Sequence, residues 1–232
     1  MLATAAMRRA CTRTLCTSPR VMRPTSQPTL SFDPSAKTAM DKQEPPAPGA
    51  DFRVVIVGAG NINFGSDEGP WNHSFRLEHK LGPRLKVVAL IDPDAERARR
   101  VLKTKCQSFV LSAYKDTVVY PTFKDYMASV CAETYPHAVW VGSPPAFRGG
   151  TEPGRNLEQL LTAGLPNVPL FIEKPVSTGA VDQTFEVAKM LEQNGSLVSV
   201  GYMLRYLKVV QKMKQIIAEN DLHVMAVNAR YI

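Results

Sequence analysis

The sequence contains no apolar run long enough to cross a membrane. Its longest runs, VVIV at 54–57 and VVALI at 87–91, have the length of strands, whereas a membrane helix needs about 20 apolar residues. Cysteine is scarce as well, and the four present (Cys11, Cys16, Cys106 and Cys131) form no C-x-x-C pair. We therefore expect no membrane association, no disulfide framework and a reducing compartment. Since the four histidines also lack ligand spacing, we expect no metal site.

Blocks of basic residues are missing from the folded part, although the net charge of the chain is +7. Residues 51–232 hold 21 Lys or Arg and 18 Asp or Glu, while residues 1–50 hold seven and three. Proteins that bind nucleic acid carry clustered basic and aromatic side chains, and neither cluster is present. We expect a small-molecule substrate and no nucleic-acid partner.

Acidic residues are absent from the start of the chain, where the first is Asp33. Arginine, serine and threonine dominate this region, which is typical of a mitochondrial transit peptide. A disordered leader, or a cytoplasmic protein whose true first residue is Met40, fits the same composition. The Pro-rich segment 43–49 reads as a linker, so residues 1–50 form the leader and the fold begins near Asp51.

The remaining sequence has an ordinary globular composition, with 44% hydrophobic and 21% charged residues. Apolar runs that are continuous rather than alternating predict strands buried on both faces. These strands are expected at 54–57, 87–91, 138–142, 169–173 and 197–201, with a weaker one at 118–120. Helical periodicity fills 93–105, 154–163 and 181–193. The alternation predicts a doubly wound α/β domain with a parallel sheet over residues 51–203.

The pattern changes after residue 203. Apolar side chains at helical spacing predict a helix over 204–217, and VMAVNARYI at 224–232 reads as a strand. A strand needs partners that this stretch does not supply. We therefore interpret residues 204–232 as a linker helix and the first strand of a second, truncated α/β domain.

The segment RVVIVGAGNINFG at 53–65 resembles the first strand and turn of a dinucleotide-binding unit. Gly58 and Gly60 satisfy the tight turn and the close approach to a pyrophosphate, whereas Asn63 occupies the position of the third glycine. Gly65 comes two residues late, and the following SDEGPWNH cannot begin a helix before about Asn72. We expect an inserted loop between the turn and the first helix.

An acidic residue that binds the ribose hydroxyls is expected about 20 residues after the glycines. Asp92 lies 32 residues beyond Gly60, and the surplus equals the inserted loop. Because Pro93 is a favourable first helical residue, Asp92 could instead cap the following helix. Both interpretations stay open at this point.

Lys174 follows the strand PLFIE directly, at the edge where parallel sheets bind ligands. A lysine that is partly desolvated there can exchange a proton with a substrate oxygen. On spacing alone, a solvated Glu-Lys pair before Pro175 is the favoured interpretation of the segment.

Taken together and in this order, the segments VVIVGAG, VVALIDPDAERA, HAVWVGSPP, FIEKPVS and VGYMLRY resemble the N-terminal half of a known family. It is the glucose-fructose oxidoreductase, inositol dehydrogenase and rhizopine catabolism (Gfo/Idh/MocA) family, and E-K-P inside a Rossmann pattern is the most specific element. The resemblance implies a nicotinamide-binding domain followed by an α/β domain that shapes the substrate pocket and the oligomer interface. Members are commonly homo-oligomers.

The resemblance also implies roles for individual residues. Lys174 would exchange a proton with the substrate hydroxyl while a hydride moves to or from the nicotinamide, with Glu173 and Pro175 fixing its approach. Ser143 and Pro144 would lie beside the nicotinamide ring, and Arg205 would join the two domains near the cofactor cleft. The expected cofactor-binding residues are Gly58, Gly60, Asn61, Ile62, Asp92, Ser143, Pro144, Glu173, Lys174 and Arg205.

One departure from the family pattern concerns a charged residue. Arg148 stands where the family often has a histidine after the Pro-Pro pair. His73 resembles the family's histidine at the start of the first helix, although a surface histidine fits the sequence as well. Asp92 favours NAD over NADP because a carboxylate repels a 2′-phosphate, while the nearby Arg97 leaves NADP open.

These expectations describe an NAD(P)-dependent oxidoreductase that acts on a hydroxyl or carbonyl group of a sugar, polyol or similar small molecule. The alternative is a truncated or non-catalytic protein that binds a dinucleotide without turnover. Without a second domain, water would reach Lys174 and remove the desolvation that tunes it.

Overall fold

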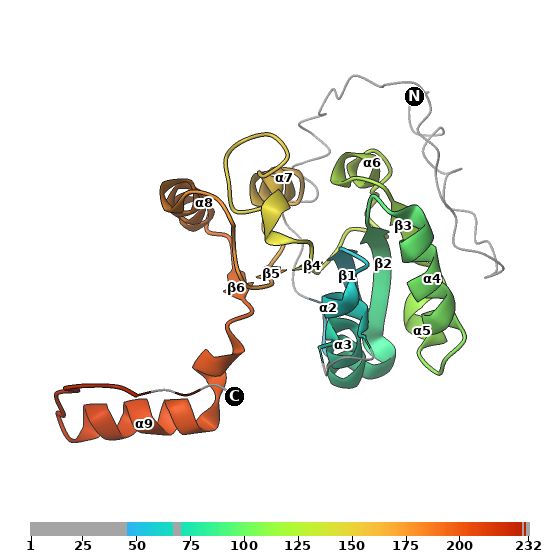
Figure 1. Ribbon diagram of the computed structural model, residues 1–232. Helices are drawn as coiled ribbons and strands as arrows, with labels where there is room; N and C mark the ends of the chain where they lie inside the picture. The colour runs from blue at the N-terminus through green and yellow to red at the C-terminus, as the bar shows by residue number, and fades with distance from the viewer. Residues whose placement is uncertain (1–45, 67–70, 229, 231–232) are drawn as a thin grey trace.

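The computed structural model describes residues 46–66, 71–228 and 230, so residues 1–45 of the expected leader lie outside the described residues. Among the described residues β1 is the first strand, and Figure 1 shows the arrangement that follows. In chain order the elements are β1 (Phe52–Val57), α2 (Asn61–Phe64), α3 (His73–Leu81), η2 (Gly82–Arg84), β2 (Leu85–Ile91), α4 (Ala95–Cys106), α5 (Leu111–Tyr114), β3 (Val118–Tyr120), α6 (Phe123–Met127), β4 (Ala138–Val141), η3 (Pro145–Phe147), α7 (Leu157–Gly164), β5 (Leu170–Ile172), α8 (Val181–Gln193), β6 (Val198–Val200), η4 (Met203–Tyr206) and α9 (Lys208–Glu219).

The six strands form one parallel sheet in the order β3-β2-β1-β4-β5-β6. The predicted doubly wound α/β fold is confirmed, and the weaker strand at 118–120 is present as β3. The chain passes outward from β1 through β2 to β3 and then returns to the other side of β1 with β4. The carboxyl ends of β1 and β4 therefore flank the switch point, where sheets of this type open a crevice for ligands.

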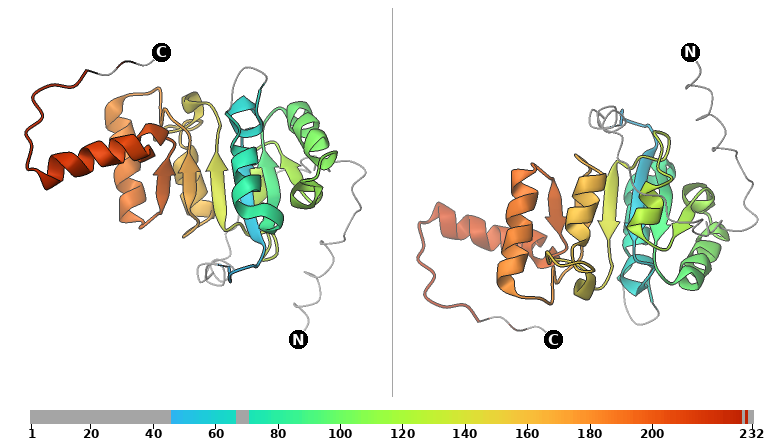
Figure 2. Two further views of the ribbon diagram at one scale, coloured as in Figure 1. Left: turned by 90° about the horizontal axis from the view of Figure 1, so that it is seen from below. Right: turned by 90° about the horizontal axis from the view of Figure 1, so that it is seen from above.

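Helices cover both faces of the sheet, as Figure 2 shows. Successive side chains of β1 alternate between two cores: Val54 and Ile56 belong to one, Val55 and Val57 to the other. The first core is completed by α3, α4 and α5, and the second by α6, α7 and α8. Burial on both faces explains why the strands read as continuous apolar runs.

Several helix boundaries differ from the sequence prediction. The helix expected from Pro93 begins at Ala95, and the one expected from residue 154 begins at Leu157. The helix expected over 204–217 is divided, with the 3₁₀ turn η4 before α9. In each case the apolar pattern of the helix continues into the turn that precedes it. Periodicity alone cannot distinguish such a turn from the first residues of the helix.

The expected strand at 224–232 does not form in the described part of that segment. Residues 222–228 adopt no helix or strand, and Met225 and Val227 are strongly exposed. An extended segment becomes a strand only when its N–H and C=O groups pair with a neighbour, and β-propensity alone does not supply one.

The C-terminal helix α9 lies beyond β6 and extends away from the sheet (Figure 1). None of its residues is buried. The helices are short, and α8, with 13 residues, exceeds α4 and α9 by one residue. Across the part of the chain that the structure describes, no helix combines the length and the apolar character needed to span a bilayer.

Two adjacent leucines of α7 test the assignment of its buried face. Leu161 is fully buried in the core with α6 and α8, whereas Leu160 is about half exposed. We expect Leu161→Ala to lower the free energy of unfolding by about 2–5 kcal/mol, because it removes buried methyl groups and leaves a cavity. Leu160→Ala should cost less than about 1 kcal/mol. Urea unfolding followed by circular dichroism measures both, and equal losses would contradict the assignment.

Candidate functional site

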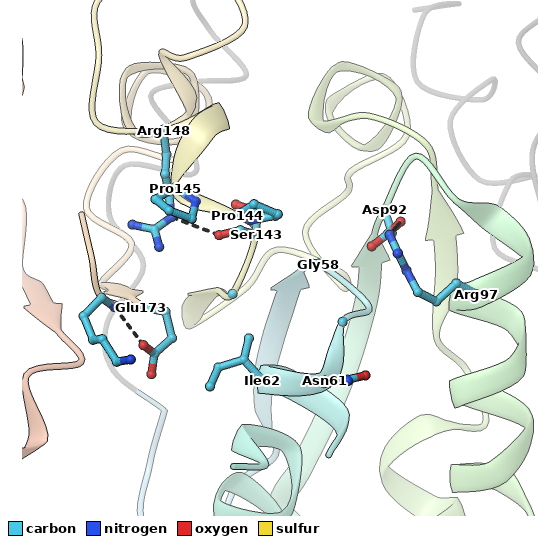
Figure 3. A pocket seen from close by; sticks show the side chains of 13 residues that line it. Gly58, Asn61, Ile62, Asp92, Arg97, Ser143, Pro144, Pro145, Arg148 and Glu173 are labelled. Carbon is cyan, nitrogen blue, oxygen red and sulfur yellow. Dashed lines mark hydrogen bonds and ion pairs between the residues drawn. The ribbon is translucent and has the colours of Figure 1, made fainter. Parts of the chain in front are cut away.

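A pocket of about 360 Å³ lies at the carboxyl ends of β1, β2, β4 and β5, at the switch point of the sheet. Figure 3 shows it from close by. Its lining consists of Gly58, Gly60, Asn61, Ile62, Asp92, Arg97, Gly142, Ser143, Pro144, Pro145, Arg148, Glu173 and Lys174. The structure thus brings together all the expected cofactor-binding residues except Arg205, which lies in η4 outside this lining and is exposed.

The turn after β1 is fixed between the two neighbouring strands. Gly58 has φ of 96° and its N–H donates to the carbonyl of Ile91 at 2.8 Å. A Cβ on Gly58 would come within 3.0 Å of Ser143 N, so the turn has no room for a side chain on the β4 side. At Gly60 the opposite holds, because a Cβ there would meet nothing within 4 Å. The surface over Gly60 is therefore open for close approach by a ligand.

Asn63 replaces the third glycine without opening the turn. It is buried, and its Nδ2 donates to the carbonyl oxygens of Gly58 at 2.7 Å and Val57 at 3.1 Å. A Cβ on Gly142 would lie 2.4 Å from the Asn63 amide. The close packing that a third glycine normally permits is thus achieved by a glycine at the end of β4. One sign of this is visible in the sequence, where Gly142 directly follows the apolar run at 138–141.

The segment between the turn and the first long helix is only partly as expected. The one-turn helix α2 begins at Asn61, directly after Gly60, which the sequence analysis did not predict. The next helix, α3, begins at His73, in agreement with the prediction that no helix starts before about Asn72, and Asn72 is its cap. Asn72 accepts from Phe75 N at 2.9 Å and donates to the carbonyl of Phe64 at 3.1 Å, so its side chain joins α3 to α2. Residues 67–70 of the insertion lie outside the described residues.

Asp92 is buried at the end of β2 and faces the glycine turn. Its Oδ2 accepts from Ala59 N at 2.6 Å, and its Oδ1 accepts from Asp94 N and from Arg97 Nη2, both at 2.8 Å. The helix cap is Asp94, whose Oδ1 accepts from Arg97 N at 2.9 Å. The interpretation of Asp92 as the cap is therefore wrong, because α4 begins two residues later than Pro93 indicated.

Glu173 is a buried carboxylate beneath the E-K-P segment. Its Oε1 lies 2.8 Å from His73 Nε2, and its Oε2 accepts from Lys174 N at 2.7 Å. A Cβ on Gly201 would lie 2.9 Å from the same carboxylate. The residue thus links α3, β5 and the end of β6, and both of its oxygens are engaged.

His73 is buried, so the surface alternative is wrong. Its ring lies edge-on against Phe171, with 5.0 Å between ring centroids, and tilted against Trp140 at 5.5 Å. Burial lowers the pKa of His73 below its ordinary value of 6.5, while the hydrogen bond and the charge of Glu173 oppose this shift. Among the described residues no hydrogen-bond partner faces its Nδ1. A neutral ring that donates from Nε2 to Glu173 satisfies this environment best.

Lys174 lies at the open side of the pocket. Its side chain is exposed, whereas Glu173 before it is buried. The Lys174–Pro175 peptide is cis. The expectation of a partly desolvated lysine is therefore not met in this chain, because no described element covers it.

Arg148 is the buried cation of the pocket, with 1% of its surface exposed. Its Nε donates to the carbonyl of Ser143 and its Nη1 to that of Val176, both at 3.0 Å. It thereby joins the loop after β4 to the loop after β5. Burial lowers the pKa of Arg148, while the charges of Glu158 and Glu173 oppose this shift. The sequence analysis noted this residue as a departure from the family but did not assign it to the site.

The buried histidine predicts a specific pH dependence of stability. The unfolded chain protonates His73 near its ordinary pKa, about 6.5, and the folded protein does so only at lower pH. Below about pH 6.5 the unfolded state therefore binds more protons, and stability falls as pH falls toward the folded pKa. We expect His73→Gln to lose less unfolding free energy than the wild type between about pH 7.5 and about pH 5.5. His79→Gln, on the exposed face of the same helix, should keep the wild-type slope, and identical slopes in all three proteins would refute the assignment.

Comparisons with known proteins agree with this geometry. Residues 52–202 match the family described as "Oxidoreductase family, NAD-binding Rossmann fold", and residues 205–232 match a "Putative oxidoreductase C terminal domain". Two uncharacterized proteins of Schizosaccharomyces pombe are 43% and 44% identical over 185 and 192 residues, which is 79% and 82% of this chain. The matches cover 48% and 47% of those proteins, so the chain spans about half the length of these relatives.

Solved structures share the fold at low sequence identity. The WlbA dehydrogenase of Chromobacterium violaceum, crystallised with NADH and UDP-GlcNAcA, has a TM-score of 0.53 at 17% identity; the match covers 77% of this chain and 43% of that one. For the scyllo-inositol dehydrogenase of Lactobacillus casei, with NAD(H) and scyllo-inositol, the TM-score is 0.50 at 18% identity, with coverage of 74% and 42%. At this identity the likeness shows the fold alone. The family match over residues 52–202 covers more than half of the chain and shows the family: the chain belongs to the Gfo/Idh/MocA oxidoreductase family, whose Rossmann domain binds NAD.

Proposed function

We propose that the protein transfers a hydride between NAD(H) and a hydroxyl or carbonyl group of a sugar, polyol or similar small molecule. The observation that carries the proposal is the lining of one pocket by the glycine turn, Asp92 and Lys174. These residues come from the ends of β1, β2 and β5, and a dinucleotide extended across a switch point reaches all three. The inositol and sugar dehydrogenases that share the fold make a polyol or sugar the natural substrate class to test.

The glycine turn fits the cofactor on two counts. The surface over Gly60 is open, so a pyrophosphate can approach the backbone, while Gly58 keeps the turn close against β4. Asp92 would bind the adenosine ribose through the remaining acceptor capacity of Oδ2, which accepts from Ala59 N. Ser143 and Pro144 would flank the nicotinamide, which supplies or accepts the hydride when bound.

NAD is the cofactor that this end of the pocket favours. The carboxylates of Asp92 and Asp94 both lie near Arg97, at 2.8 and 4.0 Å from its guanidinium nitrogens. Two negative charges against one positive charge leave the ribose end acidic, and a 2′-phosphate would be repelled there. Arg97 reduces this repulsion without reversing its sign.

Lys174 would exchange the proton of the substrate hydroxyl. Its loop begins at Glu173, whose carboxylate is fixed by His73 and by Lys174 N, so the backbone of the lysine is anchored although its side chain is exposed. A positioned general acid or base typically contributes about 10²–10⁴-fold to a rate. Because solvent reaches Lys174 in this chain, we expect its contribution to fall at the lower end of that range.

Substitution of the lysine tests the proposed chemistry. We expect the full chain to oxidise at least one member of a panel of inositols, aldoses and sugar alcohols with NAD⁺, followed as NADH absorbance. Lys174→Met should lower kcat about 100-fold, while the Kd for NADH changes less than about three-fold. Lys189→Met, which removes an exposed lysine from α8, serves as the matched control and should match the wild type.

The outcomes separate the proposal from its rival. Turnover that survives Lys174→Met would refute the role of the lysine. NADH binding without turnover of any panel member would favour the alternative, a dinucleotide-binding protein without catalysis. Absence of NADH binding by folded protein would refute both.

A further inference from the structure

The two ends of the pocket differ in charge. At the ribose end, Arg97 is paired with Asp92. At the other end, the lining includes Arg148, Lys174 and Glu173. The two carboxylate oxygens of Glu173 are hydrogen-bonded to His73 Nε2 and to Lys174 N. Because burial lowers the pKa of His73 below 6.5, its ring is neutral near pH 7 and adds no charge. The end of the pocket that holds the proposed catalytic lysine therefore carries an excess of one positive charge.

The positive charge of Arg148 is buried and has no direct ion pair in the part of the chain that the structure describes. Its side chain is buried, and within the described ranges it forms no ion pair with a carboxylate. The two carboxylates whose charge acts on it are committed elsewhere, since Glu158 accepts from Gly149 N at 2.8 Å and Glu173 is engaged as above. Burying a charge without a direct ion pair is costly even though the carboxylates of Glu158 and Glu173 attract it from a distance. A buried guanidinium without a direct ion pair can bind an anion that enters the pocket.

The hydrogen bonds of Arg148 leave part of its fork unused. Nε and Nη1 each donate one bond to a carbonyl oxygen, while no described residue accepts from Nη2. Figure 3 shows the guanidinium directed from the loop after β4 toward the side of the pocket that holds Glu173. Three N–H groups therefore remain, one on Nη1 and two on Nη2, and one from each of these nitrogens can bind the two oxygens of a carboxylate.

We propose that the substrate carries a carboxylate, which Arg148 binds beside the hydroxyl or carbonyl group that Lys174 serves. The inference rests on the proposed function and specifies its substrate class as acidic sugars or polyhydroxy acids. Arg148 is then a specificity residue: its bonds to Ser143 and Val176 orient the guanidinium, and its free edge selects the anion. A purely structural role, in which Arg148 only ties the two loops together, predicts no preference for charge in the substrate.

Matched pairs of ligands separate these two roles. D-glucuronate and D-glucose differ by a carboxylate in place of a hydroxymethyl group, and D-gluconate and D-sorbitol form the open-chain equivalent. Calorimetric titration of the NADH-saturated full chain should give a preference of at least about ten-fold for the acid in one pair or both, which corresponds to about 1.4 kcal/mol. NADH binding is measured first, so its absence would refute the proposed function rather than this inference.

Variants assign the preference to Arg148. Arg148→Gln should abolish it, and Arg148→Lys, which keeps the charge but loses the fork, should retain a reduced preference. Both should bind NADH within about three-fold of the wild type, which also reports that they are folded. Arg100→Gln removes an exposed positive charge from α4, outside the pocket lining, and controls for net charge. It should leave the preference unchanged.

Three results would overturn the inference. The first is equal affinity for acid and neutral ligand in both pairs, or no detectable binding of either acid by NADH-saturated wild type. The second is a preference that survives Arg148→Gln. The third is a loss of NADH affinity of more than about ten-fold in both folded Arg148 variants, which would assign the guanidinium to the cofactor instead.

Discussion

The contact between the Asn63 amide and the end of β4 is the constraint on which the site depends. The amide hydrogen-bonds the last carbonyls of β1 and its turn, and it occupies the space that a side chain at Gly142 would need. Gly58 meets the same stretch of β4 from the neighbouring side. The two glycines and the asparagine therefore hold β1 and β4 together where the strand order switches from one side of the sheet to the other, and the pocket opens over this junction.

From that junction the pocket divides into two electrostatic regions. Asp92 bonds the turn through Ala59 N and shares its other oxygen with Arg97, which keeps the ribose end acidic. The opposite end is held by bonds that cross between loops: Arg148 joins the loops after β4 and β5, and Glu173 joins β5 to α3 through His73. Asp92, Arg148 and Glu173 are thus each oriented by a backbone contact, which is how a rigid sheet positions side chains for chemistry.

Much of this could be predicted from the sequence, because strands buried on both faces and the glycine turn leave strong local signals. The order of elements, the acidic residue displaced by an insertion and the E-K-P segment followed from spacing. What spacing could not supply were contacts between distant segments. The packing of Asn63 against Gly142 spans 79 positions, and the burial of His73 and Arg148 depends on Glu173 and Val176. The strand expected at 224–232 does not form over residues 224–228 for the same reason, since pairing depends on neighbouring strands rather than on the segment itself.

The central claim is that the open surface over Gly60 receives NAD, and titration of the full chain with NADH tests it most directly. Gly60 has φ of −79° and ψ of 176°, which valine adopts, and its Cβ position is empty. The account predicts saturable binding by nicotinamide fluorescence, weakened at least about ten-fold in Gly60→Val, while unfolding free energy changes by less than about 0.5 kcal/mol. Equal NADH affinity in wild type and Gly60→Val, or no binding by folded wild type, would contradict the account.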